Sequence, residues 1–459
     1  MRLVTSAIAI AIAIAMLAAA SAVSTPHPGQ NGSLTAGELA MARTAWRYFQ
    51  SNTQPNTGLV NAADGYPSTT MWDTASYIGA LVAARELGVI DKSELDRRIA
   101  ALIKTLTTMS LFRGELPNKV YQTATAEKTD YANKPGEIGF SALDIGRLLI
   151  WLRIAKERYP EHADAIDSAV LRWNFCNVVD ACGTLYGAQV NGDKATAYLQ
   201  EGRLGYEEYA AKGFQLWGFD TTRASKLQPF EVTPIFGVLI AYDSRDPRKL
   251  GAHNYVVSEN YILDGIELNW DTAADRSDDD MKSSDEAIKE LADRVYRVQE
   301  VRFEKTGTLT ARTEHQLEKE PYFVYDTVFS DGYAWNTIAH DGTFQPDAAA
   351  VAVKGAFGLW VLWNGPYSNR LFDAVKGLFD TQKGFYEGIY ENGKGPIRTF
   401  TANNNGVILE CLLYKVQGKL LKFRAEPSPP GLWEREVNNL ANPRNTCLRA
   451  PQRKRECGS

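Results

Sequence analysis

Residues 143–155 read LDIGRLLIWLRIA, and residues 93–106 read SELDRRIAALIKTL. The first segment is apolar almost all round a helix, which is typical of a helix enclosed by its neighbours. In the second segment the apolar residues share one helical face, as in a helix with one side in water. These residues are Leu95, Ile99, Leu102, Ile103 and Leu106. The chain is therefore expected to be mainly α, with inner and outer helices.

Short glycine-containing segments follow the expected outer helices and space them along the chain. They begin at Gly58, Gly114, Gly183, Gly307 and Gly384, so the intervals are 56, 69, 124 and 77 residues. The longest interval is about two units, which puts a further turn at 243–247. Repeats of this length predict six helical hairpins that close into an α/α toroid over residues 34–422. Glycine also follows helices in any α-rich chain, which is the simpler alternative.

Both ends of the chain differ from the repeats. Residues 1–22 hold Arg2, an apolar run from Ala7 to Ala20, and the small-residue sequence Ala20-Ser21-Ala22, a pattern that predicts a signal peptide. We therefore expect a secreted or periplasmic protein. The run is short for a membrane anchor, the alternative, and no stable membrane span is expected after cleavage. Residues 423–459 form a short C-terminal tail that is Pro-rich and then basic.

Export would make disulfides possible among the five cysteines. Cys176 and Cys182 lie six residues apart around a turn, and Cys447 and Cys457 flank the basic tail. We expect these two local pairs, although spacing alone does not fix connectivity. Cys411 lies in an apolar helical run and is expected to be a buried free thiol.

Composition excludes several classes of function. Lys and Arg number 50 against 55 Asp and Glu, a net charge of −5, so no nucleic-acid partner is expected. The five His residues show no metal-ligand spacing, and neither a metal nor another cofactor is expected. The acidic stretch 271–280 lacks the EF-hand pattern and is interpreted as a solvated loop.

The loops that lead into the expected inner helices combine carboxylates with aromatic rings. In a ring of hairpins these loops open on one face, and this combination suits a carbohydrate, because rings stack on sugars and carboxylates accept hydrogen bonds from hydroxyls. The candidate catalytic residues are Asp73, Glu137, Glu207, Glu208 and Glu387. The candidate substrate-binding residues are Trp72, Asp144, Glu201, Tyr206, Tyr209, Phe385 and Tyr386.

Glycosidic cleavage needs one protonated and one ionised acid. We expect Asp73 to be the ionised one, with its pKa lowered by a helix N-terminus, unless it is merely a first-turn acid. Glu207 or Glu208 is expected to be the donor, with a pKa raised by desolvation. Glu387 and Glu391 would share one face of a short hairpin, unless that segment is an exposed loop.

Three motifs carry a resemblance to a known family. They are Thr70-Met71-Trp72-Asp73-Thr74-Ala75-Ser76-Tyr77, Gly136-Glu137-Ile138-Gly139-Phe140-Ser141-Ala142-Leu143-Asp144 and Glu201-Gly202-Arg203-Leu204-Gly205-Tyr206-Glu207-Glu208-Tyr209-Ala210. With them the chain resembles the bacterial domain-of-unknown-function family 3131 over nearly all of its mature length. That family is similar to the glucoamylase-like α/α toroids, which include hydrolases and lyases of extracellular or periplasmic glucans. The resemblance implies the fold more firmly than the activity.

The leading hypothesis is an exported glycoside hydrolase that acts on a polysaccharide, either an exopolysaccharide or a β-glucan. A noncatalytic glycan-binding or envelope assembly factor remains an alternative. A polysaccharide lyase is a second one, with Tyr209 and either Arg203 or His253 neutralising a uronate, but acid-rich loops would repel such a substrate.

Overall fold

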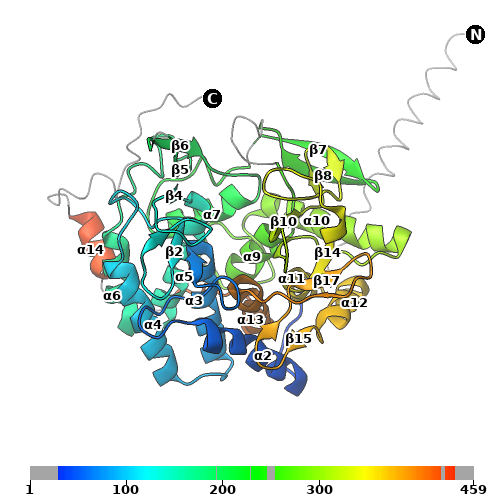
Figure 1. The fold of residues 1–459 in the computed structure, drawn as a ribbon, viewed down its shortest axis with the longest axis horizontal. Coiled ribbons are helices and arrows are strands. Elements are labelled where there is room, and N and C mark those ends of the chain that lie inside the picture. Colours follow the sequence, from blue (N-terminus) through cyan, green and yellow to red (C-terminus); the bar gives the residue numbers. More distant parts are fainter. Residues whose placement is uncertain (1–28, 193, 228, 246–253, 425–429, 440–459) are drawn as a thin grey trace, which may run out of the picture.

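The computed structural model describes residues 29–192, 194–227, 229–245, 254–424 and 430–439 (Figure 1). The expected signal peptide 1–22, His253, Cys447 and Cys457 lie outside the described residues, as does most of the expected tail. In the part that is described, no helix is long and apolar enough to cross a membrane.

Six inner helices form a closed ring around the centre of the molecule (Figure 1). Each contacts the next in chain order, and the last packs against the first. They are α3 (Met71–Glu86), α5 (Ala142–Arg158), α7 (Tyr206–Leu216), α9 (Glu259–Leu268), α11 (Val353–Leu362) and α13 (Ala402–Gln417). The apolar circumference of α5 explains its place, because nearly all of its side chains are buried between α3 and α7.

The outer layer consists of helices with one solvent-exposed face. They are α2 (Ala36–Asn52), α4 (Lys92–Thr108), α6 (Ala163–Leu171), α10 (Glu286–Thr306) and α12 (Pro366–Val375). Helix α4 buries the five residues that its sequence pattern selects, Leu95 to Leu106. Between α7 and α9 the described residues form a hairpin of β7 (Phe230–Ile235) and β8 (Val238–Asp243). The turn expected at 243–247 therefore begins at the end of a strand, and residues 246–253 are not described.

Short antiparallel strands and two single-turn helices connect the helices. They are β1 (Ser68–Thr70), β2 (Val120–Gln122), β3 (Lys128–Thr129), β4 (Gly139–Phe140), η1 (Pro160–His162), β5 (Tyr186–Val190), β6 (Thr196–Gln200), β9 (Glu314–Gln316), β10 (Phe323–Asp326), β11 (Phe329–Ser330), β12 (Tyr333–Ala334), β13 (Thr337–Ile338), η2 (Pro346–Ala348), β14 (Ala350–Ala352), β15 (Phe379–Asp380), β16 (Gly384–Phe385), β17 (Gly388–Tyr390) and β18 (Pro396–Ile397). Strands β1, β4 and β14 lead almost directly into α3, α5 and α11, so the short sheets fix the first turns of inner helices.

Residues 430–439 pack on the outside of the ring through α14 (Leu432–Asn438), which contacts α6. The Trp433 indole is buried, meets the Trp217 ring edge-on at 5.0 Å and donates to the Trp217 carbonyl. Lys156 binds Glu434 at 3.1 Å. Arg153 lies 3.6 Å from the same carboxylate, so this end of the described chain is anchored to the ring by one buried aromatic residue and two ion pairs.

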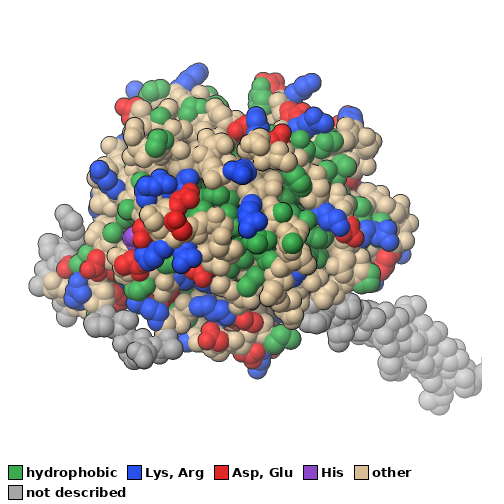
Figure 2. Space-filling view, turned by 90° about the horizontal axis from the view of Figure 1, so that it is seen from below, with side chains coloured by type: hydrophobic (Ala, Val, Ile, Leu, Met, Phe, Trp, Pro, Cys, Tyr) green, Lys and Arg blue, Asp and Glu red, His purple; other side chains and the backbone are tan. Residues whose placement is uncertain are grey.

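The face of the molecule shown in Figure 2 carries both signs of charge. Lys and Arg side chains alternate with Asp and Glu side chains, with hydrophobic side chains between them, as expected for a net charge of −5. Among the cysteines, Cys411 is buried and free, which confirms that expectation. The pairing of Cys176 with Cys182 stays a prediction.

Candidate active site

The first turns of four inner helices meet at Glu259, the first residue of α9. The Lys354 ammonium on α11 lies 2.5 Å from its carboxylate. The Asn403 amide on α13 donates to it at 2.7 Å, and the Trp72 indole on α3 donates at 3.3 Å. These contacts require the four helices to begin at the same end of the ring. We call this end the mouth.

Below Glu259 a buried cation fills the axis of the ring. The guanidinium of Arg147, on α5, is fully buried and lies 4.7 Å from the centroid of the Trp72 ring. It lies 3.5 Å from Glu267 and 3.3 Å from Glu410, both of which are fully buried. Burial raises the pKa of Glu267 to about 7, against the opposing effect of Arg147. These charged groups form the floor of the mouth.

Asp144 and Glu201 lie together where α5 begins. The Ser141 hydroxyl caps the helix and donates to Asp144 at 3.0 Å, while Glu201 accepts a hydrogen bond from the Ala142 backbone N–H. Both carboxylates are half-buried. Burial raises the pKa of Asp144 to about 7, and the negative charges of Glu201 and Asp73 raise it further. Asp144 is therefore partly protonated at neutral pH and still accessible.

A third half-buried carboxylate, Glu314, stands on β9. The Tyr206 hydroxyl, from the first turn of α7, donates to it at 3.0 Å. Burial and the charge of Glu259 raise the pKa of Glu314, while Arg203 and Lys354 act in the opposite direction. A raised pKa makes the ionised form a stronger proton acceptor, which is what a general base needs.

The first correction concerns Asp73. It was expected to be ionised with a lowered pKa, but burial raises the pKa of this carboxyl despite its hydrogen bonds to Thr70. Asp73 is 8% exposed and forms a capping box with Thr70. Its burial outweighs the favourable helix terminus, so the prediction was wrong in sign.

The second correction concerns the expected proton donor. Burial raises the pKa of Glu207 to about 7, as expected, but its side chain is fully buried and bound by Arg245 at 3.0 Å. Glu208 is also fully buried and accepts the Gly205 backbone N–H at 2.6 Å, as the acid of a capping box. Neither carboxyl is accessible to a substrate. Glu208 caps the N-terminal turn of α7, and Glu207 is held by Arg245.

Glu137 and Glu387 are likewise held by other groups. Lys128 binds Glu137 and lowers its pKa. Glu387 is 2% exposed and accepts hydrogen bonds from the Thr401 hydroxyl at 2.6 Å and the Gln316 backbone at 3.0 Å. Glu391 instead binds two arginines. The predicted short hairpin is formed by β17 and β18, and the two acids flank β17, but each carboxylate is held by other groups of the chain. Strand β17 pairs with β14 and β18.

The expected stacking residues divide into two groups. Trp72 is half-buried at the mouth, with Tyr206 5.9 Å away and Tyr209 6.3 Å away between ring centroids. Tyr209 is fully buried and donates to Glu267 in the floor. Phe385 is a core residue packed on Phe357, and Tyr386 packs on Phe400, so neither forms part of this cluster.

Sequence reasoning missed Glu259, Glu314, Lys354 and Arg147. Helix α9 begins at Glu259, and Asp264 is a buried partner of Lys212 in its second turn. Lys354 offered a usable signal, because a cation inside an apolar helix implies a buried acidic partner.

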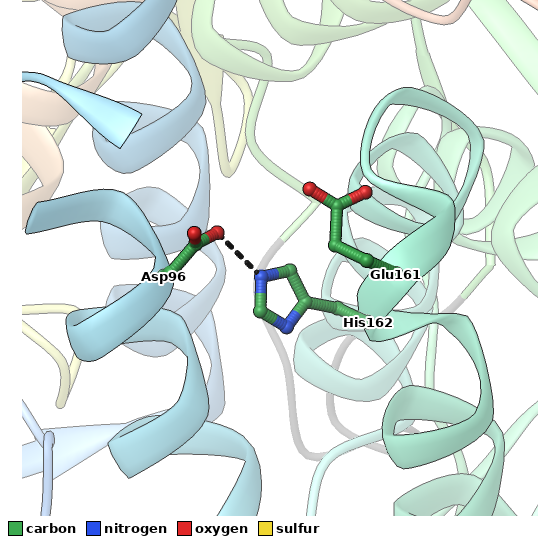
Figure 3. A group of neighbouring side chains, drawn as sticks. All are labelled: Asp96, Glu161 and His162. Carbon is green, nitrogen blue, oxygen red and sulfur yellow. Dashed lines mark hydrogen bonds and ion pairs between the residues drawn. The ribbon is translucent and has the colours of Figure 1, made fainter. Parts of the chain in front are cut away.

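Among the described residues, one group has the spacing for a metal ion: Asp96, Glu161 and His162 (Figure 3). The His162 ring, from η1, points across to Asp96 on α4, with Nε2 2.9 Å from the carboxylate. Lys92 lies 2.7 Å from both Asp96 and Glu161 and lowers the pKa of each. A cation of the chain thus already neutralises this surface group, which joins two neighbouring outer elements.

Comparison with known proteins identifies the family. The model of DUF3131, described as "Protein of unknown function", matches residues 40–418. The chain belongs to this family. No functionally curated protein matches it.

Three solved structures share the fold at low sequence identity. A glucoamylase-like protein of Bacteroides caccae has 11% identity and a TM-score of 0.61, covering 84% of this chain and 94% of its own. The endo-β-1,2-glucanase of Chitinophaga pinensis, solved with sophorotriose and glucose, has 12% identity, a TM-score of 0.56 and the same coverage. The endo-β-1,2-glucanase of Talaromyces funiculosus, with sophorose, has 12% identity and a TM-score of 0.54, covering 84% of both chains. The chain is therefore helix-rich with the glucoamylase-like α/α toroid fold.

Proposed function

We propose that this DUF3131 chain is an exported glycoside hydrolase that cleaves a β-linked glucan, with β-1,2-glucan the first substrate to test. The apolar N-terminal segment with its small-residue site supports export. The two β-1,2-glucanases among the similar structures support the substrate class. The proposal rests on the chemistry of the mouth, because fold alone does not imply activity.

The observation that carries the proposal is the accessible carboxyl of Asp144, whose pKa is about 7. Glu207 and Glu267 reach a similar pKa, but both are fully buried. A general acid must hold its proton near working pH and reach the leaving oxygen, and Asp144 meets both conditions. Its protonated side chain donates to the glycosidic oxygen as the bond breaks.

Glu314 supplies the second carboxylate that glycosidic cleavage requires. Its partner is the Tyr206 hydroxyl, and its half-buried position leaves it open to a water or a sugar ring. Glu201 acts differently: it is a positioning residue whose negative charge keeps the proton on Asp144. The floor below, held by Arg147, excludes water from one side of the site.

The purified protein should release new reducing ends from a β-glucan when incubated with a panel of β-glucans, exopolysaccharides and uronans. A lyase would instead produce an unsaturated product that absorbs at about 235 nm. Because the proposed acids catalyse hydrolysis and leave no double bond, this absorbance should not rise. Release of unsaturated uronates would replace the proposal with a lyase. Binding without cleavage of any glycan would indicate an assembly factor.

A further inference from the structure

A column of three side chains forms one wall of the mouth. The Arg203 guanidinium lies 4.2 Å from the centroid of the Tyr255 ring, and the Tyr325 ring stacks on Tyr255 at 4.5 Å with an interplanar angle of 25°. Tyr206 meets Tyr255 edge-on at 6.2 Å, and its hydroxyl binds Glu314. The column therefore stands directly beside the proposed second carboxylate.

Arg203 keeps its hydrogen-bonding capacity free. It is half-buried, and within the described residues no oxygen accepts a hydrogen bond from its guanidinium. A guanidinium carries five N–H donors, and one this close to carboxylates usually forms an ion pair with them. Its stacking on Tyr255 fixes the plane of the group, so the donors are held in place without being used.

Tyr131 lies near this column on a different loop. Its side chain is 67% exposed. Desolvation by the surrounding protein nevertheless raises the pKa of its hydroxyl, and the charges of Asp144, Tyr325 and Glu201 raise this pKa further. The exposed ring therefore lies within electrostatic range of the two carboxylates and of Tyr325. The loop is fixed, because the Tyr66 hydroxyl donates to the Tyr131 carbonyl at 2.9 Å and Asp130 accepts two backbone N–H bonds.

We propose that Tyr131, Tyr325 and Arg203 form a subsite that holds one hexopyranose unit of the substrate next to Asp144. The apolar face of the sugar packs on the exposed Tyr131 ring and the half-buried Tyr325 ring, and its hydroxyl oxygens accept hydrogen bonds from the Arg203 guanidinium. A neutral sugar suits this position, because the charges of Asp144 and Glu201 act on Tyr131 and that of Glu314 acts on Arg203, and all three would oppose an anionic substituent. This assignment rests on the proposed function and names where its substrate binds.

The test measures binding apart from turnover. Calorimetry with a β-1,2-gluco-oligosaccharide is carried out on the full chain carrying Asp144→Asn, with and without further substitutions. Tyr131→Ala and Arg203→Gln should each raise the dissociation constant about tenfold. This is the scale of a lost ring contact or of lost charge-assisted hydrogen bonds. Tyr131→Phe keeps the ring and should stay within about twofold. Tyr333→Ala, at an equally exposed tyrosine on β12, is the matched control and should change nothing.

The subsite would be overturned if Tyr131→Ala and Arg203→Gln bound the oligosaccharide as tightly as the parent, or if the parent did not bind it. Unchanged binding together with hydrolysis by the wild type would remove the subsite and leave the proposed function standing. The expected loss of binding without any hydrolysis by the wild type would remove the proposed function and leave the subsite.

Discussion

Asp144→Asn should lower kcat on the β-glucan substrate by about 10²-fold or more, because an amide cannot donate the proton that the leaving oxygen needs. The fold should survive, since the asparagine oxygen can still accept the hydrogen bond from the Ser141 hydroxyl that Asp144 accepts now. Steady-state kinetics together with a circular dichroism spectrum would check both points. Glu314→Gln should cause a loss of similar size.

The matched control for this prediction is Asp164→Asn. Asp164 is an exposed acid on α6, in the outer layer, so its replacement should leave kcat unchanged. Full activity of Asp144→Asn would assign the proton donor to another carboxyl. Equal loss in Asp164→Asn would show that the assay reports general damage rather than loss of a reacting group.

Arg147→Met should destabilise the chain by about 3–5 kcal/mol, the cost of leaving buried carboxylates without their cation. Arg147 is the shared partner of Glu267 and Glu410 in the floor, and all three are fully buried. The free energy of unfolding from denaturant titration measures the effect. Arg97→Met, at an exposed arginine of α4, should stay within about 0.5 kcal/mol.

The loss of stability caused by Arg147→Met should be larger at higher pH. In the folded chain the pKa of Glu267 is about 7, above its ordinary value of 4.5, and burial also raises the pKa of Glu410. Protonation of Glu267 thus favours folding fully below pH 4.5, and this contribution is lost as the pH rises through 7. Without Arg147 both pKa values rise further, so the destabilisation should be larger at about pH 8 than at about pH 5. Equal destabilisation at the two pH values would contradict an ionic role for Arg147 in the floor.

The helical layers could be predicted from periodicity because burial selects side chains by face. Helix α4 buries the stripe that its sequence shows, and α5 is enclosed as its apolar circumference requires. The rule that acids gather where inner helices begin also placed Asp144 and Glu201 near each other. Periodicity says nothing about which carboxylate is accessible, and this is why Glu207 was preferred over Asp144.

The remaining site residues could not be predicted because their roles depend on contacts distant in sequence. Glu259 becomes central only when α11 brings Lys354 and α13 brings Asn403 to it. Glu314 lies on a short strand, where no helix start marks it. Tyr131 belongs to a loop whose position depends on Tyr66, 65 residues earlier.

The pH dependence of kcat/KM on the β-glucan, measured for the wild type and for Glu201→Gln, tests most directly whether Asp144 is the proton donor. Because Asp144 must be protonated to act, wild-type activity should fall as the pH rises through about 7. Glu201→Gln removes a charge that raises the pKa of Asp144, so the fall should move to lower pH while the maximal rate is largely kept. A fall at the same pH in both proteins, or no fall near neutral pH in the wild type, would contradict the assignment.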